Sequence, residues 1–170
     1  MAISTEAIKT LRERSGAGIM DCKRALEEAG GVIEEAEKIL NRKGLATASK
    51  KAARVADQGL VEVYVHAGGR LGVMVEVNCE TDFVARTNEF KTLSHDLALQ
   101  VAAMNPKYVS PSEIPPDSDE VPEEVCLVLQ PFIRDSDRTV QDIITETIAK
   151  TGENIRVRRF VRFELGTRSA

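Results

Sequence analysis

Tryptophan is absent from this sequence of 170 residues, which also has only two tyrosines and five phenylalanines. Aromatic side chains on which nucleic-acid bases stack are therefore scarce. The formal net charge is −4, from 23 basic and 27 acidic residues, so there is no excess of lysine and arginine to neutralise phosphates. This composition predicts that the protein does not bind nucleic acid directly.

Long apolar runs are missing too. No stretch approaches the roughly 20 apolar residues that a helix needs to span a bilayer. The first residues show neither the basic region nor the apolar region of a secretory signal peptide. The three cysteines, Cys22, Cys79 and Cys126, are far apart and odd in number, which is typical of free thiols in a reducing compartment. We therefore expect a cytoplasmic protein with no membrane association.

Signatures of catalysis and of cofactor binding are also absent. The sequence has no P-loop, no dinucleotide-binding glycine pattern after a strand and no C-x-x-C pair. Its two histidines, His66 and His95, lack neighbours at metal-ligand spacing. Cys79 and His95 leave one alternative open, a reactive thiolate pair, although a cysteine at the end of a strand is more often a small buried hydrophobe. We expect no metal, no cofactor and no enzymatic activity.

The hydrophobic fraction of 42% is sufficient for a sizeable core, in one medium domain or two small ones. Residues 1–45 hold three segments with apolar residues at helical spacing, separated by glycine-containing breaks at 15–18 and 30–31. Ser4 stands where a helix N-cap is expected, and the third helix should end near Gly44. Short connections between three amphipathic helices predict a compact bundle.

A basic segment follows the bundle. Residues 42–54 contain no acidic residue and five basic ones, interleaved mostly with alanine, serine and threonine. Such a segment is most simply a solvated helical linker, and a phosphate-binding patch is the alternative. We therefore divide the chain into an N-terminal domain at 1–45, a basic linker at 46–57 and a core domain at 58–170.

The core domain mixes both periodicities. Strands are predicted at 60–66, 71–78 and 155–165, and helices at 88–104 and 139–150. A turn at residues 67–70 makes the first two strands a hairpin, and Thr139 with Asp142 matches a capping box. Residues 110–124, with four prolines and six acidic residues, predict a mobile loop. The expected fold is α+β, with helices packed on a three-stranded antiparallel sheet.

The junction between the second strand and the helix at 88 has the sequence Asn-Cys-Glu-Thr-Asp-Phe-Val-Ala-Arg, residues 78–86. Such a junction can hold a side chain rigidly and point it outward. Phe83 has two interpretations here. It either packs beneath the following helix, as most phenylalanines do, or it is an exposed anchor, next to the Asp82 carboxylate, that inserts into a pocket of a partner. The residue pattern does not choose between them.

Three segments of the chain, in order, resemble bacterial elongation factor Ts. They are LRERSGAGIMDCKRAL at residues 11–26, EVNCETDFVAR at 76–86, and an ending that runs from GENI at 152–155 to RFVRFELG at 159–166. The similarity covers nearly the whole chain and is weakest across residues 105–124. The family is the guanine-nucleotide exchange factor for elongation factor Tu. The resemblance implies a ubiquitin-associated-like three-helix domain, a linker and an α+β core.

The resemblance also implies residue roles. In the family the Thr-Asp-Phe-Val motif engages the GTPase domain of elongation factor Tu, and its phenylalanine wedges in near the bound magnesium ion. The matching residues here are Thr81, Asp82, Phe83 and Val84. A second contact is implied for the N-terminal domain, at Arg12, Ile19 and Met20. Ile19 departs from the methionine of some members, a change that preserves an apolar contact.

This chain is similar to the short form of the family, which lacks a second core half and a helical hairpin module and in which the sheets of two subunits pair. The predicted sheet itself favours a homodimer, because the helices can cover only one of its faces. We place Val157, Val161 and Phe163 on one side of the last strand, and Phe160 on the other. The second face is then partly apolar around Phe160, with a charged rim that includes Glu62, Glu76, Arg156, Arg158 and Arg162. The alternative is a monomer whose second face is covered by the linker or by the loop.

The expected function is nucleotide exchange on elongation factor Tu, by a protein without chemistry of its own. Two rival functions remain. One is a ubiquitin-associated-like adaptor without exchange activity, which would not need the Asp82–Phe83 pair. The other is a thiol enzyme that uses Cys79, which would need an accessible thiolate.

Overall fold

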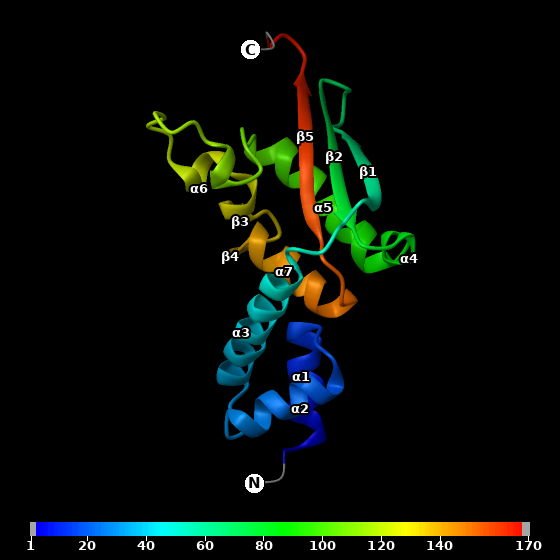
Figure 1. Cartoon of the computed structure of the whole chain (residues 1–170), viewed down its shortest axis with the longest axis vertical. Helices are drawn as coiled ribbons and strands as arrows, with labels where there is room; N and C mark the ends of the chain where they lie inside the picture. Colours follow the sequence, from blue (N-terminus) through cyan, green and yellow to red (C-terminus); the bar gives the residue numbers. More distant parts are fainter. Residues whose placement is uncertain (1–2, 168–170) are drawn as a thin grey trace. The chain divides into compact units, whose positions relative to one another are not determined.

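The computed structural model describes residues 3–167 and divides into two compact units (Figure 1). The first unit ends at Arg54 and also includes Thr145–Asn154 from near the other end of the chain. The second unit consists of Val55–Ile144 and the residues from Ile155 onward. Helix α7 (Val140–Thr151) therefore begins in the second unit and continues in the first. The outermost residues of the expected domains, 1–2 and 168–170, lie outside the described residues.

The first unit contains three helices, as predicted: α1 (Thr5–Ser15), α2 (Ile19–Glu28) and α3 (Ile33–Lys51). The Ala7 amide donates to the Ser4 hydroxyl at 3.1 Å, which confirms Ser4 as the N-cap of α1. Three large side chains are buried with three small ones in the core, which consists of Leu11, Cys22, Ala25, Leu26, Ala36 and Ile39. Small residues let the three helices approach closely, so a short chain still buries a continuous core.

The third helix is longer than the sequence indicates. It passes through Gly44 without a break, so the predicted end there is wrong, and much of the basic segment is helical. Gly44 is buried, and a Cβ at this position would lie 3.6 Å from Cγ2 of Thr145 on α7. Within the first unit this glycine provides close helix packing rather than a helix end, since a glycine inside a helix commonly has a packing reason.

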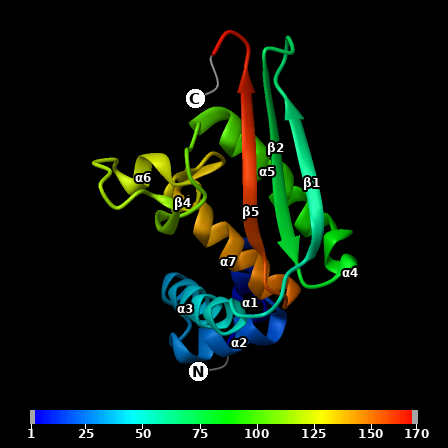
Figure 2. The same ribbon diagram turned by 45° about the horizontal axis from the view of Figure 1, so that its top comes forward.

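The second unit contains a sheet of three antiparallel strands in the order β1–β2–β5 (Figure 2). The strands are β1 (Gln58–Val65), β2 (Leu71–Cys79) and β5 (Arg156–Glu164). Helix α5 (Asn88–Met104) lies against one face, where Val73, Val75 and Val77 are buried with Phe90 and Leu97. The predicted α+β fold with helices on a three-stranded antiparallel sheet is confirmed.

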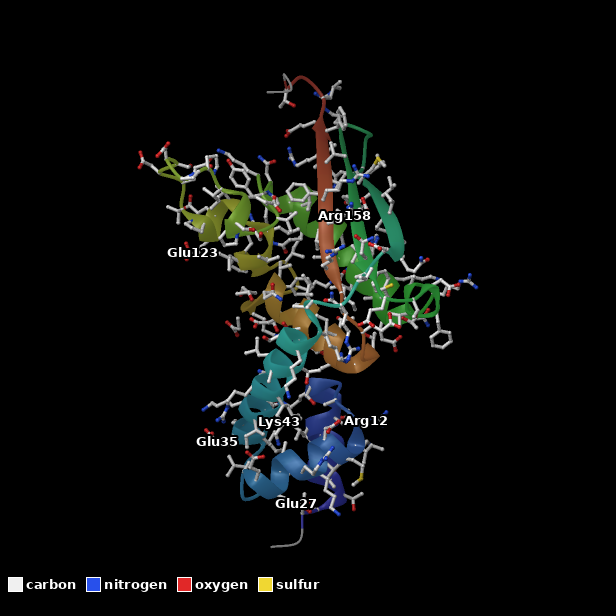
Figure 3. The ribbon with its side chains drawn as sticks, in the orientation of Figure 1. Arg12, Glu27, Glu35, Lys43, Glu123 and Arg158 are labelled. Carbon is white, nitrogen blue, oxygen red and sulfur yellow. The ribbon has the colours of Figure 1, made fainter. Side chains whose placement is uncertain are left out.

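The register of β5 corrects the predicted sides of this strand. Glu76 pairs with Arg159 but Val77 pairs with Val157, so Arg158 is an extra residue in β5 (labelled in Figure 3). Such a bulge interrupts the alternation of side chains between the two faces. Val157 and Phe160 consequently both lie on the face covered by α5, paired with Val77 and Val75.

The open face differs accordingly from the predicted one. It carries Val161 and Phe163 rather than Phe160, because each residue beyond the bulge has changed sides. Two residues of the predicted charged rim also belong to the covered side. Glu62 pairs with Val75 there, and the Arg162 guanidinium donates to the carbonyl of Ala102 on α5 at 3.3 Å.

The segment predicted as a mobile loop contains regular structure instead. It includes the 3-10 helix η1 (Pro111–Glu113) and begins the helix α6 (Pro122–Val125), which η2 (Leu127–Leu129), β3 (Pro131–Phe132) and β4 (Asp135–Thr139) follow. Hydrogen bonds from two buried glutamines hold this region. Gln100 on α5 donates to the carbonyl of Pro131 at 3.0 Å, and Gln130 donates to the carbonyl of Glu124 at 2.8 Å.

The capping box before α7 is confirmed. The amide of Thr139 donates to Oδ2 of Asp142 at 2.8 Å, and the amide of Asp142 donates to the Thr139 hydroxyl at 3.2 Å. These reciprocal bonds satisfy backbone donors at the start of the helix. In the part of the chain that the structure describes, no helix has the length and apolar character to cross a membrane.

Candidate functional site

A helix of four residues, α4 (Asp82–Ala85), stands between β2 and α5, beside the end of β2 (Figures 1 and 2). Thr81 is its N-cap, with the hydroxyl accepting a hydrogen bond from the Val84 amide at 3.4 Å. The Asp82 carboxylate accepts a hydrogen bond from the Arg86 guanidinium at 2.8 Å. Both partners of that pair are exposed, so it contributes little to stability.

Adjacent side chains of α4 point in opposite directions. Phe83 is 77% exposed, whereas Val84 is 5% exposed and Ala85 is 8% exposed. The interpretation in which Phe83 packs beneath the following helix is therefore wrong. Val84 is the residue that anchors α4 to the core, and it leaves the phenylalanine ring presented to solvent. An exposed ring on a turn with a buried neighbour is the arrangement of an interface anchor.

The proposed thiolate pair does not form. Cys79 is fully buried and its thiol donates to the carbonyl of Thr81 at 3.1 Å. His95 instead contacts Glu62, with its Nδ1 3.0 Å from the carboxylate. Burial raises the pKa of the Cys126 thiol, with several acidic residues adding to the effect, so this cysteine also stays a thiol at neutral pH. No group of three or more histidine, cysteine, aspartate or glutamate residues within residues 3–167 is placed to hold a metal ion.

The second predicted contact lies at the junction of α1 and α2 in the first unit. Gly16 ends α1 in the left-handed conformation, with φ of 64°, and Gly18 precedes α2. Ile19 and Met20 are the first two residues of α2, and they are 55% and 61% exposed. Arg12 is in the last turn of α1 and extends outward (Figure 3). The structure thus groups these residues at one helix junction with their side chains accessible.

A third exposed apolar surface is the open face of the sheet, opposite α5. Three cross-strand rows form it: Val61–Glu76–Arg159, Val63–Met74–Val161 and Val65–Gly72–Phe163. The large apolar side chains in these rows are all between 41% and 68% exposed. The sequence pattern predicts an apolar surface on the sheet, but it places Phe160 there. The bulge at Arg158 decides which residues of β5 form this surface.

The charges of this open face lie at one end. Glu76 accepts a hydrogen bond from Arg159 at 2.7 Å and lies 3.8 Å from the Arg158 guanidinium. Hydrogen bonding by Arg159 is the main cause that lowers the pKa of the Glu76 carboxyl, with smaller contributions from Asn78 and Arg158. The carboxylate therefore stays ionised at neutral pH, next to an apolar surface.

Comparison with known proteins gives consistent matches. Residues 23–123 match the family described as Elongation factor TS. The chain is 50% identical to elongation factor Ts of Carboxydothermus hydrogenoformans over 194 aligned positions, which cover 96% of this chain and 89% of that protein. It is also 50% identical to elongation factor Ts of Moorella thermoacetica, with 96% of each chain covered. Elongation factor Ts of Thermoanaerobacter sp. is similar at 50% identity, over 96% of this chain and 95% of that protein.

Proposed function

The chain belongs to the elongation factor Ts family, and from this premise we propose that it is the guanine-nucleotide exchange factor for elongation factor Tu in translation elongation. The observation that carries the proposal is the exposed ring of Phe83 on a turn whose next residue, Val84, is buried. A binding protein of this kind performs no covalent chemistry and needs no cofactor of its own. It acts in the cytoplasm, where translation elongation takes place.

The proposed mechanism is a displacement at the partner's magnesium site. Phe83 enters the GTPase domain near the bound Mg²⁺, while Thr81 and Asp82 flank it at the surface of the turn. A magnesium ion that bridges phosphates is a large local charge, so disturbing it weakens nucleotide binding. By linkage, a factor that binds the nucleotide-free state more tightly lowers the affinity for GDP by the same ratio. Val84 is buried, so its part is to hold the turn from beneath.

The first unit supplies a second contact in this proposal. Arg12, Ile19 and Met20 bind the GTPase domain through an accessible apolar surface next to a cation. We assign residues 1–45 to a ubiquitin-associated-like contact domain, 46–57 to the linker and 58–170 to the core domain. The helical continuation of α3 to Lys51 makes the first part of that linker stiff.

Release of a fluorescent GDP analogue from elongation factor Tu tests the function. The partner is loaded with the analogue in Mg²⁺ buffer, unlabelled GDP is added in excess, and the release rate is followed as this chain is added. We expect release to accelerate and then reach a plateau with concentration. Binding without acceleration would support the adaptor instead. Removing Mg²⁺ with a chelator should make the acceleration smaller, since the ion is what the factor displaces.

We further propose that two copies of the chain pair through the open sheet face. Its middle row, Val63–Met74–Val161, is apolar and exposed, and such contiguous apolar surface is uncommon on monomers. A twofold contact lets one face serve both subunits, because the surface needs only to complement itself. The Glu76 cluster supplies charges at the rim of that contact.

Sedimentation at micromolar concentration tests the pairing. A single species near 18.6 kDa would contradict it. Met74→Asp should convert a dimer to a monomer, since Met74 lies at the centre of the open face. Tyr64→Phe on the covered face is the control and should leave the mass unchanged. Phe160 is unsuitable for this purpose, because it faces α5.

A further inference from the structure

The base of the Phe83 turn is unusually closely packed. Gly59 of β1 pairs with Asn78 of β2, immediately before the turn. Its φ is 141°, and a Cβ at this position would collide with the carbonyl oxygen of Val77 and lie 2.8 Å from Cα of Asn78. Two backbones approach here at a distance that only glycine permits. The start of β1 is thus pressed against the last residues of β2.

Asn78 fixes this contact with its side chain. It is 6% exposed, and its amide nitrogen donates to the carbonyl of Gln58 at 3.2 Å and toward Glu76 at 3.4 Å. Among the described residues its buried Oδ1 accepts no hydrogen bond. Rotating the amide by 180° would set that oxygen against the Gln58 carbonyl, so the observed orientation is the better one. A buried acceptor without a donor is costly, which indicates that Asn78 serves something other than stability.

Cys79 continues the contact toward the turn. Its buried thiol donates to the carbonyl of Thr81 at 3.1 Å, and the Thr81 hydroxyl in turn caps α4. Hydrogen bonds therefore join Asn78 to β1, and join the next residue, Cys79, to Thr81. Thr81 in turn caps the helix that bears Phe83. A helix of four residues has no stability of its own, because its nucleation is unfavourable. Its geometry must come from this base.

We propose that Gly59, Asn78 and Cys79 are positioning residues, which hold the α4 turn in one geometry so that Phe83 meets the partner already oriented. This inference rests on the proposed exchange function. If the α4 turn had to become ordered on binding, the cost of ordering would offset part of the free energy that Phe83 gains from its contacts with the partner. Asn78 and Cys79 are buried, and Gly59 is half-buried and has no side chain with which to contact the partner.

The first test is the GDP-release assay with Cys79→Ala, which removes the buried thiol and its hydrogen bond to the carbonyl of Thr81. We expect the plateau release rate to fall about three- to tenfold, the value of one hydrogen bond, with little change in the concentration that gives half of the plateau. Cys79→Ser keeps a donor and should recover most of the rate. Gly59→Ala should lower the plateau rate more. The control is Cys126→Ala, which removes another fully buried thiol, from the chain between α6 and η2.

The second test separates positioning from general stability. In a Phe83→Ala background, Cys79→Ala should cause no further loss, because the residue acts only through the ring. An equal loss in both backgrounds, or an unchanged plateau rate in both Cys79→Ala and Gly59→Ala, would overturn the inference. Thermal unfolding of each variant establishes that it is folded at the assay temperature.

A third readout needs no partner. Fluorine NMR of fluorophenylalanine-labelled protein, with the Phe83 signal assigned from its loss in Phe83→Leu, reports the environment of the ring. We expect the Cys79→Ala signal to broaden or split, and the Cys126→Ala signal to match the parent. An unchanged signal in Cys79→Ala would contradict positioning, even if exchange is confirmed. If the parent protein fails to accelerate GDP release but the signal changes, the proposed function fails while the bracing of the turn stands.

Discussion

The two exposed apolar sites proposed to bind elongation factor Tu are built in different ways. Ile19 and Met20 stand at the start of α2, after a glycine-containing break, on a small bundle in which half of the core residues are alanine or cysteine. Phe83 stands on a four-residue helix that is capped, anchored by Val84 and braced by the end of a sheet. The first site offers accessible apolar area on a small scaffold. The second fixes the direction of a single ring.

From this difference we infer that the α2 site contributes mainly to binding and the α4 site mainly to the rate of GDP release. The accessible apolar area at α2 contributes affinity whether or not the partner holds GDP. The oriented ring of Phe83 can instead favour one state of the partner, the nucleotide-free one. We therefore expect changes at α2 to alter the concentration dependence of exchange, and changes at α4 to alter its maximal rate.

Neighbouring substitutions in α4 should have opposite consequences for folding. Val84→Asp places a carboxylate in the core, and an unpaired buried charge costs several kcal/mol, so we expect the second unit to unfold. Phe83→Asp puts the same group at a position that is 77% exposed and should leave the unfolding temperature nearly unchanged. Circular dichroism against temperature measures both. Equal destabilisation by the two variants would show that Phe83 is part of the core.

Deleting residues 1–50 should weaken partner binding strongly and leave the sheet folded. The sheet and α5 belong wholly to the second unit. The second half of α7 should fray, because Thr145 loses its contact with Gly44 and Lys150 loses its packing against Gly16. Hydrogen exchange is the measurement, with protection expected in β2 and lost in α7 beyond Ile144. Loss of protection throughout the chain would contradict separate folding of the core.

The double variant Ile19→Ala, Met20→Ala should raise the half-saturating concentration for GDP release by about 30-fold, with an unchanged plateau rate. Each truncation removes apolar area worth about 1 kcal/mol at a partly exposed site. Val32→Ala, which is also exposed in the first unit, is the matched control and should behave like the parent. A lowered plateau rate in the double variant would remove the distinction between the two sites.

The smallest effect is expected at Glu76. Its folded-state pKa is lowered, chiefly by the hydrogen bond from Arg159, so its contribution to stability is present above the unfolded pKa and lost as the pH falls through the folded one. Unfolding midpoints in urea should therefore depend less on pH below about 4.3 in Glu76→Gln than in the parent. Glu89→Gln on α5 is the control. The change should be modest, since solvent screens the pair.

Most elements of the fold were predictable because each has a local signal. Helix α5 begins and ends where the sequence predicts, since Thr87 caps it and Asn105 ends it in the left-handed conformation. The length of α3 was not predictable from Gly44, because packing against Thr145 overrides a local helix-breaking preference. The region from η1 to β4 was missed for a similar reason. Its order depends on hydrogen bonds between residues far apart in sequence, from Gln100 to the Pro131 carbonyl and from Gln130 to the Met104 carbonyl.

The candidate site was predictable only in part. The residue pattern located the junction at residues 78–86 but left the direction of Phe83 open, because exposure is a property of the folded chain. The family resemblance favoured an exposed ring. The composition of the open sheet face was wrong for one reason, the extra residue Arg158, since one bulge reverses every later side chain of a strand. The roles of Gly59 and Asn78 had no sequence signal, as they arise from the pairing of two strands.

The most direct measurement of the central claim is the plateau rate of GDP release from elongation factor Tu with saturating Phe83→Ala. Loss of one interface anchor commonly costs about 2 kcal/mol or more, so we predict a plateau roughly 30-fold lower than that of the parent. The variant should unfold at the parent's temperature and still bind the partner through the first unit. A plateau rate equal to the parent's, from a folded and bound variant, would contradict the claim that Phe83 drives exchange.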